Sequence, residues 1–165
     1  MGSQGSVMLD TELCMIGAGP AGMAAARTAA DSGVSCVLLD EQSTAGGQIY
    51  RGVAHSSHAR RRVLGRDYEA GLGLTEALDH PDIQYCGGVT VWSVQPNGTV
   101  GYSRQGRGQA LRARRVLLAT GALERPVPIP GWTLPGVMTA GAAQILLEGA
   151  GLLGQRAVIA GRGRC

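Results

Sequence analysis

The sequence predicts an α/β fold: a Rossmann-like FAD/NAD(P)-binding domain, in which a central parallel sheet is flanked by helices and carries an inserted β-meander. Three observations predict it. An apolar segment leads into a glycine-rich run from Gly17 to Gly22, an alanine-rich helical segment follows, and Asp40 stands eighteen residues after Gly22. A strand, a phosphate-binding turn, a helix and an acidic residue in this order are typical of a dinucleotide site.

The glycine-rich turn joins the first predicted strand, Leu13 to Ile16, to the first helix. Gly17 permits the tight turn, and Gly19 has no side chain to block a pyrophosphate. Gly22 lets the helix lie close against the sheet, and Pro20 suits the first helical turn. Because the amides at a helix start are unpaired and partly positive, this turn is suited to a diphosphate.

The second predicted strand runs from Ser35 to Leu39, after a turn at Gly33, and Asp40 follows at its carboxyl end. A carboxylate at this place can accept hydrogen bonds from both hydroxyls of an adenosine ribose, and it would repel a 2′-phosphate. The site is therefore expected to favour FAD or NAD over NADP.

A loop with the paired glycines Gly46 and Gly47 comes next, where the backbone can approach another group closely. A helix is then predicted from Arg60 to about His80, with Leu64, Tyr68 and Leu72 on one face. The arginines at its start are interpreted as a solvated face.

Short β segments and one further sheet strand follow the helix. The last strand, Arg115 to Ala119, ends in Thr120 and Gly121, so small residues stand at the carboxyl end of the sheet, where this fold binds its ligand. The expected β-meander before it consists of Ile83–Tyr85, Val89–Val94, Thr99–Ser103 and Ala110–Arg112.

Four prolines between Pro126 and Pro135 exclude a helix there, and a short apolar helix is expected from Thr139 to Gly149. A new strand and glycine turn are expected from Ala157 onward. The predicted organisation is a leader (1–10), the N-terminal segment of an FAD-binding domain (11–125), a proline-rich crossing segment with a helix (126–154), and the truncated start of a second dinucleotide-binding domain (155–165).

Composition excludes several classes of function. The formal charge is +3, and all 15 basic residues are arginine, so neither nucleic-acid binding nor lysine Schiff-base chemistry is indicated. The four cysteines form no C-x-x-C cluster and the histidines have no metal-ligand spacing, so buried thiols in a reducing, cytoplasmic compartment and no metal are expected. No apolar stretch has the length of a membrane span.

The ordered set of the glycine turn with Asp40, the pair Gly46–Gly47, and the strand end Ala119-Thr120-Gly121 resembles the two-dinucleotide-binding-domain flavoproteins. More narrowly, segments 39–42, 46–51, 119–126 and 130–142 are similar to the FAD-dependent alpha-type subunits of opine oxidases, hydrogen cyanide synthase and hydroxyproline dehydrogenase. The similarity extends over roughly residues 11 to 160.

The resemblance implies an FAD cofactor, oxidation of a C–N bond next to a carboxylate in a small-molecule substrate, and electron transfer from the flavin to a partner subunit or carrier. NAD(P) would belong to the second domain. No catalytic residue is identified. The implied FAD contacts are Gly17, Gly19, Pro20, Ala21 and Gly22 for the diphosphate, Asp40 or Glu41 for the ribose, Gly47 and Gln48 for the ribityl side, the Val89 backbone for the adenine, and Thr120 and Gly121 near the diphosphate and isoalloxazine.

Three alternatives remain open. One is a disulfide reductase of the thioredoxin-reductase type, which would have its cysteines in the second domain. A NAD-dependent dehydrogenase with one Rossmann domain would account for the first forty residues but not for the Gly46–Gly47 loop or the meander. Another alternative is a truncated, non-catalytic chain that binds nucleotide or only pairs with other subunits. A disulfide reductase of the glutathione-reductase type is disfavoured, because Gln48 to Gly71 contains no cysteine.

Overall fold

The computed structural model describes residues 9–152 and 154–161. They fall into two compact units, of which the first ends at Leu123 and the second begins at Glu124. Each unit is described by itself.

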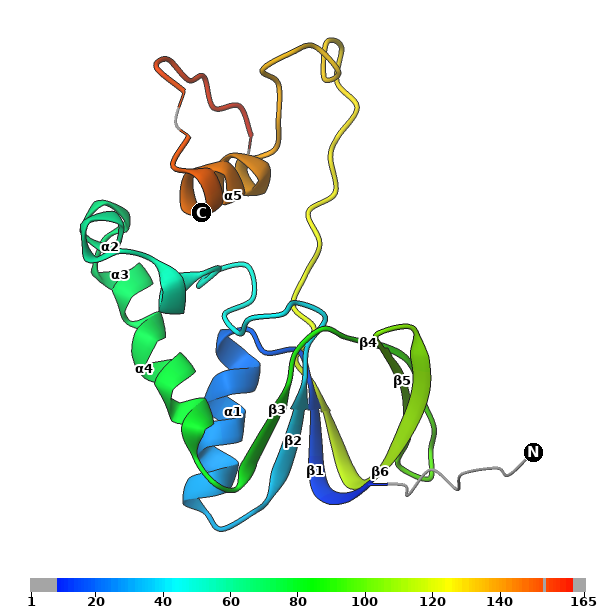
Figure 1. Cartoon of the computed structure of the whole chain (residues 1–165). Coiled ribbons are helices and arrows are strands. Elements are labelled where there is room, and N and C mark those ends of the chain that lie inside the picture. Colours follow the sequence, from blue (N-terminus) through cyan, green and yellow to red (C-terminus); the bar gives the residue numbers. More distant parts are fainter. Residues whose placement is uncertain (1–8, 153, 162–165) are drawn as a thin grey trace. The chain divides into compact units, whose positions relative to one another are not determined.

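The first unit is built on one six-stranded sheet in the order β3-β2-β1-β6-β5-β4 (Figure 1). The neighbours β3, β2, β1 and β6 are parallel, whereas β6, β5 and β4 are antiparallel. The predicted fold class is confirmed, and the sheet is mixed. The strands are β1 (Leu9–Ile16), β2 (Cys36–Leu39), β3 (Ile83–Cys86), β4 (Val89–Val94), β5 (Thr99–Arg104) and β6 (Arg107–Leu118).

Three strand predictions were wrong in detail. β3 does not belong to the meander: it pairs in parallel with β2, with Ile83 opposite Cys36. The two strands expected on either side of Ala113 form one strand, β6. Residues 107–112 of β6 pair with β5 and residues 111–118 pair with β1, so the pairing does not break at Ala113. Leu9 and Asp10, expected in the leader, belong to β1; residues 1–8 of that leader lie outside the described residues.

Two layers of core lie on opposite faces of the parallel strands, because side chains alternate along a strand. Met15 packs with Met23 and Ala26 of α1 (Pro20–Asp31) on one face. Cys14 packs on the other face with Leu111 of β6. Helix α1 therefore covers one face, and β5 and β4 curl over the other (Figure 1).

The single helix predicted from Arg60 to His80 was wrong. Gly65 has a φ of +94°, which interrupts the helix, so Leu64 and Tyr68 do not share one helical face. The Tyr68 hydroxyl instead donates to the carbonyl oxygen of Arg51 at 2.7 Å. The stretch contains η1 (Val53–His55), α2 (His58–Leu64), α3 (Arg66–Glu69), α4 (Gly71–Glu76) and η2 (Ala77–Asp79).

The second unit contains α5 (Ala140–Ala150), which matches the helix predicted from Thr139 to Gly149 to within one residue at each end. The Thr139 hydroxyl caps its amino end. The proline-rich segment before it forms no helix, as the four prolines predicted. The strand expected from Ala157 is not formed in residues 154–161, where Val158 and Ile159 are 97% and 90% exposed and have no neighbouring strand. The end of that expected element, residues 162–165, lies outside the described residues.

No helix among the described residues is long and apolar enough to cross a membrane.

Candidate functional site

The predicted site residues of the first unit gather at the carboxyl edge of the parallel strands. Ile16, Leu39 and Leu118 lie side by side, since Ile16 is in register with each of the other two. The glycine turn, Asp40 and Thr120 follow these three strand ends. Ligands of open α/β sheets bind at this edge.

Gly17 and Gly22 are required by the packing of the turn. Gly17 has a φ of +105°, and a Cβ atom at this position would lie 2.3 Å from the Ala119 carbonyl oxygen. A Cβ atom on Gly22 would lie 1.8 Å from the Gly17 carbonyl oxygen. The turn therefore packs tightly against both α1 and the residue that follows β6.

The start of α1 has unpaired amides. Gly19 is the N-cap residue and Pro20 follows as the first helical residue, and no side chain among the described residues caps this end. The first turn also contains no acidic residue. Because amide hydrogens and the positive end of the helix dipole both point outward here, the site can hold an anion such as a diphosphate.

The second glycine loop lies against the first. The Gly46 amide donates to the Ala18 carbonyl oxygen at 2.8 Å. A Cβ atom on Gly47, where φ is +62°, would come within 2.7 Å of the Gly19 Cα. Two glycine motifs that are separate in the sequence therefore lie in direct backbone contact, and Gly19 and Gly47 are only partly buried where they meet.

Tyr50 anchors this second loop, a role that sequence reasoning missed. Its amide donates to the Gly46 carbonyl oxygen at 3.1 Å. Its ring lies so close to Gly71 in α4 that a Cβ atom there would be 2.4 Å from the Tyr50 Cγ. No pattern in the sequence links Tyr50 with Gly71.

Asp40 faces the turn. Its side chain is buried, and its Oδ2 accepts a hydrogen bond from the Ala18 amide at 2.5 Å. Its Oδ1 accepts one from the Gln42 amide at 2.7 Å. Glu41, the neighbouring acid, is exposed.

The other predicted contacts lie around the same edge. The Gln48 side chain is exposed, and its Nε2 donates to the Ala122 carbonyl oxygen at 2.8 Å. Thr120 lies beside Gly17, and Gly121 is exposed with a φ of +68°. Val89 is buried, and its amide donates to the Asp40 carbonyl oxygen at 2.8 Å, so this amide is not available to an adenine in this arrangement.

The thiols of Cys14, Cys36 and Cys86 are free. Burial raises the pKa of Cys14 to about 12, with a smaller contribution from the other two thiols, and burial also raises the pKa of Cys36 and of Cys86. These thiols stay protonated near neutral pH, which does not suit redox chemistry. Among the described residues, no cluster of three or more His, Cys, Asp or Glu could hold a metal.

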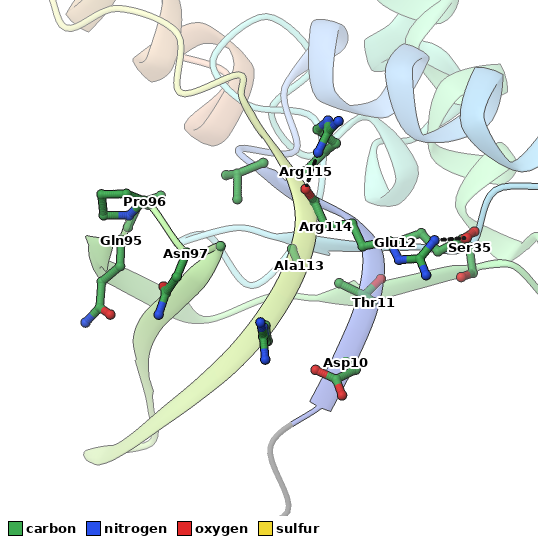
Figure 2. A pocket seen from close by; sticks show the side chains of 14 residues that line it. Asp10, Thr11, Glu12, Ser35, Gln95, Pro96, Asn97, Ala113, Arg114 and Arg115 are labelled. Atoms are coloured by element: carbon green, nitrogen blue, oxygen red, sulfur yellow. Dashed lines mark hydrogen bonds and ion pairs between the residues drawn. The ribbon is translucent and has the colours of Figure 1, made fainter.

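A depression of about 850 Å³ lies beside the amino half of β1 and the middle of β6 (Figure 2). Asp10, Glu12 and Arg114 are among its lining residues, and Arg114 and Glu12 form an ion pair at 3.8 Å. Because this depression lies toward the amino end of β1, away from the glycine turn, we assign it no part in dinucleotide binding.

The chain matches the family model described as pyridine nucleotide-disulphide oxidoreductase over residues 11–164. It is 49% identical over 150 residues to an opine oxidase subunit of Agrobacterium tumefaciens (strain Ach5), covering 86% of this chain and 30% of that protein. It is 38% identical over 139 residues to hydrogen cyanide synthase subunit HcnB of Pseudomonas aeruginosa, covering 81% and 29%. The resemblance to these two kinds of subunit is confirmed.

Among solved structures, L-proline dehydrogenase from P. horikoshii gives a TM-score of 0.68 at 20% identity, covering 86% of this chain and 28% of that chain. At this identity the likeness shows the fold alone. The chain spans 30% of the length of the opine oxidase subunit.

Proposed function

Because the chain belongs to the pyridine nucleotide-disulphide oxidoreductase family, we propose that it forms the FAD-binding portion of a flavoprotein that oxidises a C–N bond in an amino-acid-derived or opine-like substrate. The contact between the two glycine motifs, Gly19 and Gly47, is the observation that carries the cofactor part. The identity with the opine oxidase subunit supports the substrate class.

The residues at the carboxyl edge fit a dinucleotide diphosphate. Neither Gly19 nor Gly47 has a side chain where the two residues meet, so a diphosphate can reach their backbone. The uncapped amides at the start of α1, those of Ala21 and Gly22, would donate to its oxygens. Gly17 and Gly22 hold this backbone in place, as their packing requires.

The second glycine loop favours FAD over NAD as the cofactor of this site. A single Rossmann unit that binds NAD needs only the first turn and the acid after β2. Gly46 and Gly47 extend the surface beyond that turn, toward the Gln48 side chain and the Thr120–Gly121 strand end. A longer ligand with a ribityl chain and an isoalloxazine ring would lie along this extension.

When bound, FAD would supply the hydride acceptor for the oxidation. The chain's own residues bind and orient it: the turn holds the diphosphate, and the loop around Gly47 lines the path toward the flavin. None of the residues at this edge is assigned as a catalytic acid or base. The named relatives are subunits, which supports electron transfer from the flavin to a partner subunit.

The cofactor proposal is tested by the visible spectrum of the purified chain and by identifying the ligand released on heating. Flavin bands and FAD at near one per chain support it. A colourless chain that cannot be reconstituted with FAD, but binds NAD, would move the assignment to a NAD-dependent Rossmann domain.

The substrate proposal is tested by adding opines and N-methyl or cyclic amino acids to the FAD-loaded protein without oxygen. Bleaching of the flavin bands by an opine, with no bleaching by the matching amino acid alone, supports the proposed class. Bleaching by NADH alone would contradict it.

A further inference from the structure

Trp92 is a large apolar side chain on the solvent side of the antiparallel half of the sheet. Val91, Val100 and Leu111 point into the core beneath β4, β5 and β6, so the residues next to them in each strand lie on the opposite, outer face. Trp92 lies on this outer face and is 65% exposed. The core and the proposed FAD site do not include it.

Two local features hold Trp92 in this place. The pairing of β4 with β5 shifts between Val91 and Ser93, so Trp92 is an extra residue of β4 at a bulge. Its ring lies over Gly101 of β5, where a Cβ atom would come within 2.7 Å of the Trp92 Cη2. A bulge re-aims side chains at the edge of a sheet, and a glycine lets a ring lie close against the strand. The fold therefore positions the indole and leaves it open to solvent.

The strands around Trp92 carry positive charge alone. Residues 83–123 contain five arginines and no acidic residue, and all five arginines are exposed. Arg112 lies on the outer face with Trp92, since its neighbours Leu111 and Ala113 are both in the core. Among the residues that the structure describes, Arg112 has no ion pair.

Two more of these arginines stand opposite each other at the hairpin that joins β5 to β6. Arg104 is in register with Arg107, and like charges directly opposite one another destabilise a sheet. Neither arginine has an ion pair within the described part of the chain. The fold itself gains nothing from this pair, whereas carboxylates of another molecule would relieve the repulsion.

We propose that the outer face of β4, β5 and β6, centred on Trp92, docks an acidic surface of a partner protein subunit. Tryptophan and arginine are the side chains that most often dominate binding at protein interfaces. The indole would enter an apolar pocket of the partner. Carboxylates around that pocket would pair with Arg112 on the face and with Arg104 and Arg107 at its end.

Charge and the relatives together indicate this kind of partner. The opine oxidase and hydrogen cyanide synthase relatives are each named as a subunit, which supports a protein rather than a nucleic acid. A second copy of the same face would bring two sets of arginines together, at a cost in free energy. The inference rests on the partner subunit of the proposed function and not on the FAD site.

Binding of an acidic peptide to the full chain tests this surface. The probe is a fluorescein-labelled peptide of alternating glutamate and leucine residues, followed by fluorescence anisotropy. It should bind at low salt, and its affinity should fall as salt is added. The matching peptide of alternating lysine and leucine should not bind.

Trp92→Ala should weaken the acidic peptide about tenfold or more, because it removes the central side chain. Trp132→Ala is the matched control, since Trp132 is also exposed but belongs to the second unit. Arg112→Gln should weaken binding several-fold and reduce its salt dependence. Arg62→Gln, which changes an exposed arginine of α2, should do neither. Gly101→Ala keeps the indole but pushes it from its place, so it should also weaken binding.

Absence of peptide binding, or equal losses in the Trp92 and Trp132 variants, would overturn the proposal. Preferential binding of an oligodeoxythymidine would overturn it in favour of a nucleic acid. Self-association in sedimentation velocity that Trp92→Ala abolishes would make the face a contact between copies instead. A colourless chain that still binds the peptide would reject the FAD site alone. If Trp92→Ala does not fold, Gly101→Ala and Arg112→Gln still decide the matter.

Discussion

The backbone of Gly47 lies directly against that of Gly19: a Cβ atom on Gly47 would come within 2.7 Å of the Gly19 Cα. The two residues stand in different loops, after β2 and β1 respectively. Their contact leaves a surface of bare backbone next to the uncapped start of α1. A diphosphate can approach such a surface, whereas side chains would keep it away.

Gly47→Ala is expected to weaken FAD binding by tenfold or more, because the new methyl group would push the second loop off Gly19. Gly52→Ala is the matched control, since its φ of +67° is close to the +62° of Gly47 but nothing lies within 4 Å of its Cβ position. Fluorescence titration with FAD measures both. Equal losses in the two variants would attribute the effect to backbone strain rather than to the contact.

Gly19→Val should abolish FAD binding while the chain stays folded. Gly19 has a φ of −75°, which other residues adopt readily, and the nearest atom to a Cβ built there is 3.9 Å away. The branched side chain would occupy the place of the diphosphate. Circular dichroism should remain native-like, and retained flavin after purification would contradict the assignment of the turn.

Gly22→Ala should destabilise the fold by about 2–3 kcal/mol, because the methyl group would overlap the Gly17 carbonyl oxygen in a packed interior. Gly73→Ala is the control within another helix. Nothing lies within 4 Å of its Cβ position, so it should stabilise the chain by about 0.5–1 kcal/mol. Urea unfolding followed by circular dichroism measures the free energy of unfolding of both variants. If Gly22→Ala leaves this free energy unchanged, the close packing at Gly22 is refuted.

Gly71→Ala should also destabilise the chain, through the Tyr50 ring that lies against it. In a Tyr50→Ala background the same substitution should cost much less, because the ring is gone and only the Cβ atom of residue 50, at 2.9 Å, still lies against the new methyl group. A double-mutant cycle by urea unfolding measures this coupling. Additive effects of the two substitutions would mean that Tyr50 does not anchor the second glycine loop on α4.

The free energy of unfolding should fall as pH rises above 9, because burial raises the pKa of Cys14 from 9.0 to about 12. Between these pH values the thiol ionises in the unfolded chain but stays protonated in the folded chain. Ionisation therefore stabilises the unfolded state relative to the folded state. The loss is about 1.4 kcal/mol per pH unit for one such group. In Cys14→Ala, the free energy of unfolding measured with urea should decline less steeply from pH 9 to pH 11. An unchanged slope would assign the loss to other groups, such as Tyr85, because burial raises the pKa of Tyr85 to about 12 as well.

Elements with local determinants were predicted well. The strand-turn-helix around Gly17 to Gly22 and the helix that Thr139 caps follow from apolar patterning, glycine sterics and capping. The long helix from Arg60 was predicted wrongly. The helical periodicity continues through Gly65 in the sequence, but the backbone has a positive φ at that residue and the helix ends there.

Pairing between distant segments could not be predicted in the same way. The strand β3 has the length and apolar character of a meander strand, and only its partner, β2, identifies it as part of the parallel sheet. The continuity of β6 likewise depends on two different neighbours along its length. The partner of a strand depends on the packing of the whole sheet, and the sequence of one strand alone does not specify that packing.

By itself, the sequence determined the fold class, the glycine turn and the edge of the sheet at which a dinucleotide would bind, because steric limits on single residues and strand order dictate them. Only the tertiary structure decided that Asp40 faces the Ala18 amide, that Glu41 stays exposed and that Gly47 reaches Gly19. The physical reason is that a carboxylate accepts from whichever donor the surrounding strands bring to it. That donor comes from a segment twenty-two residues away in the chain.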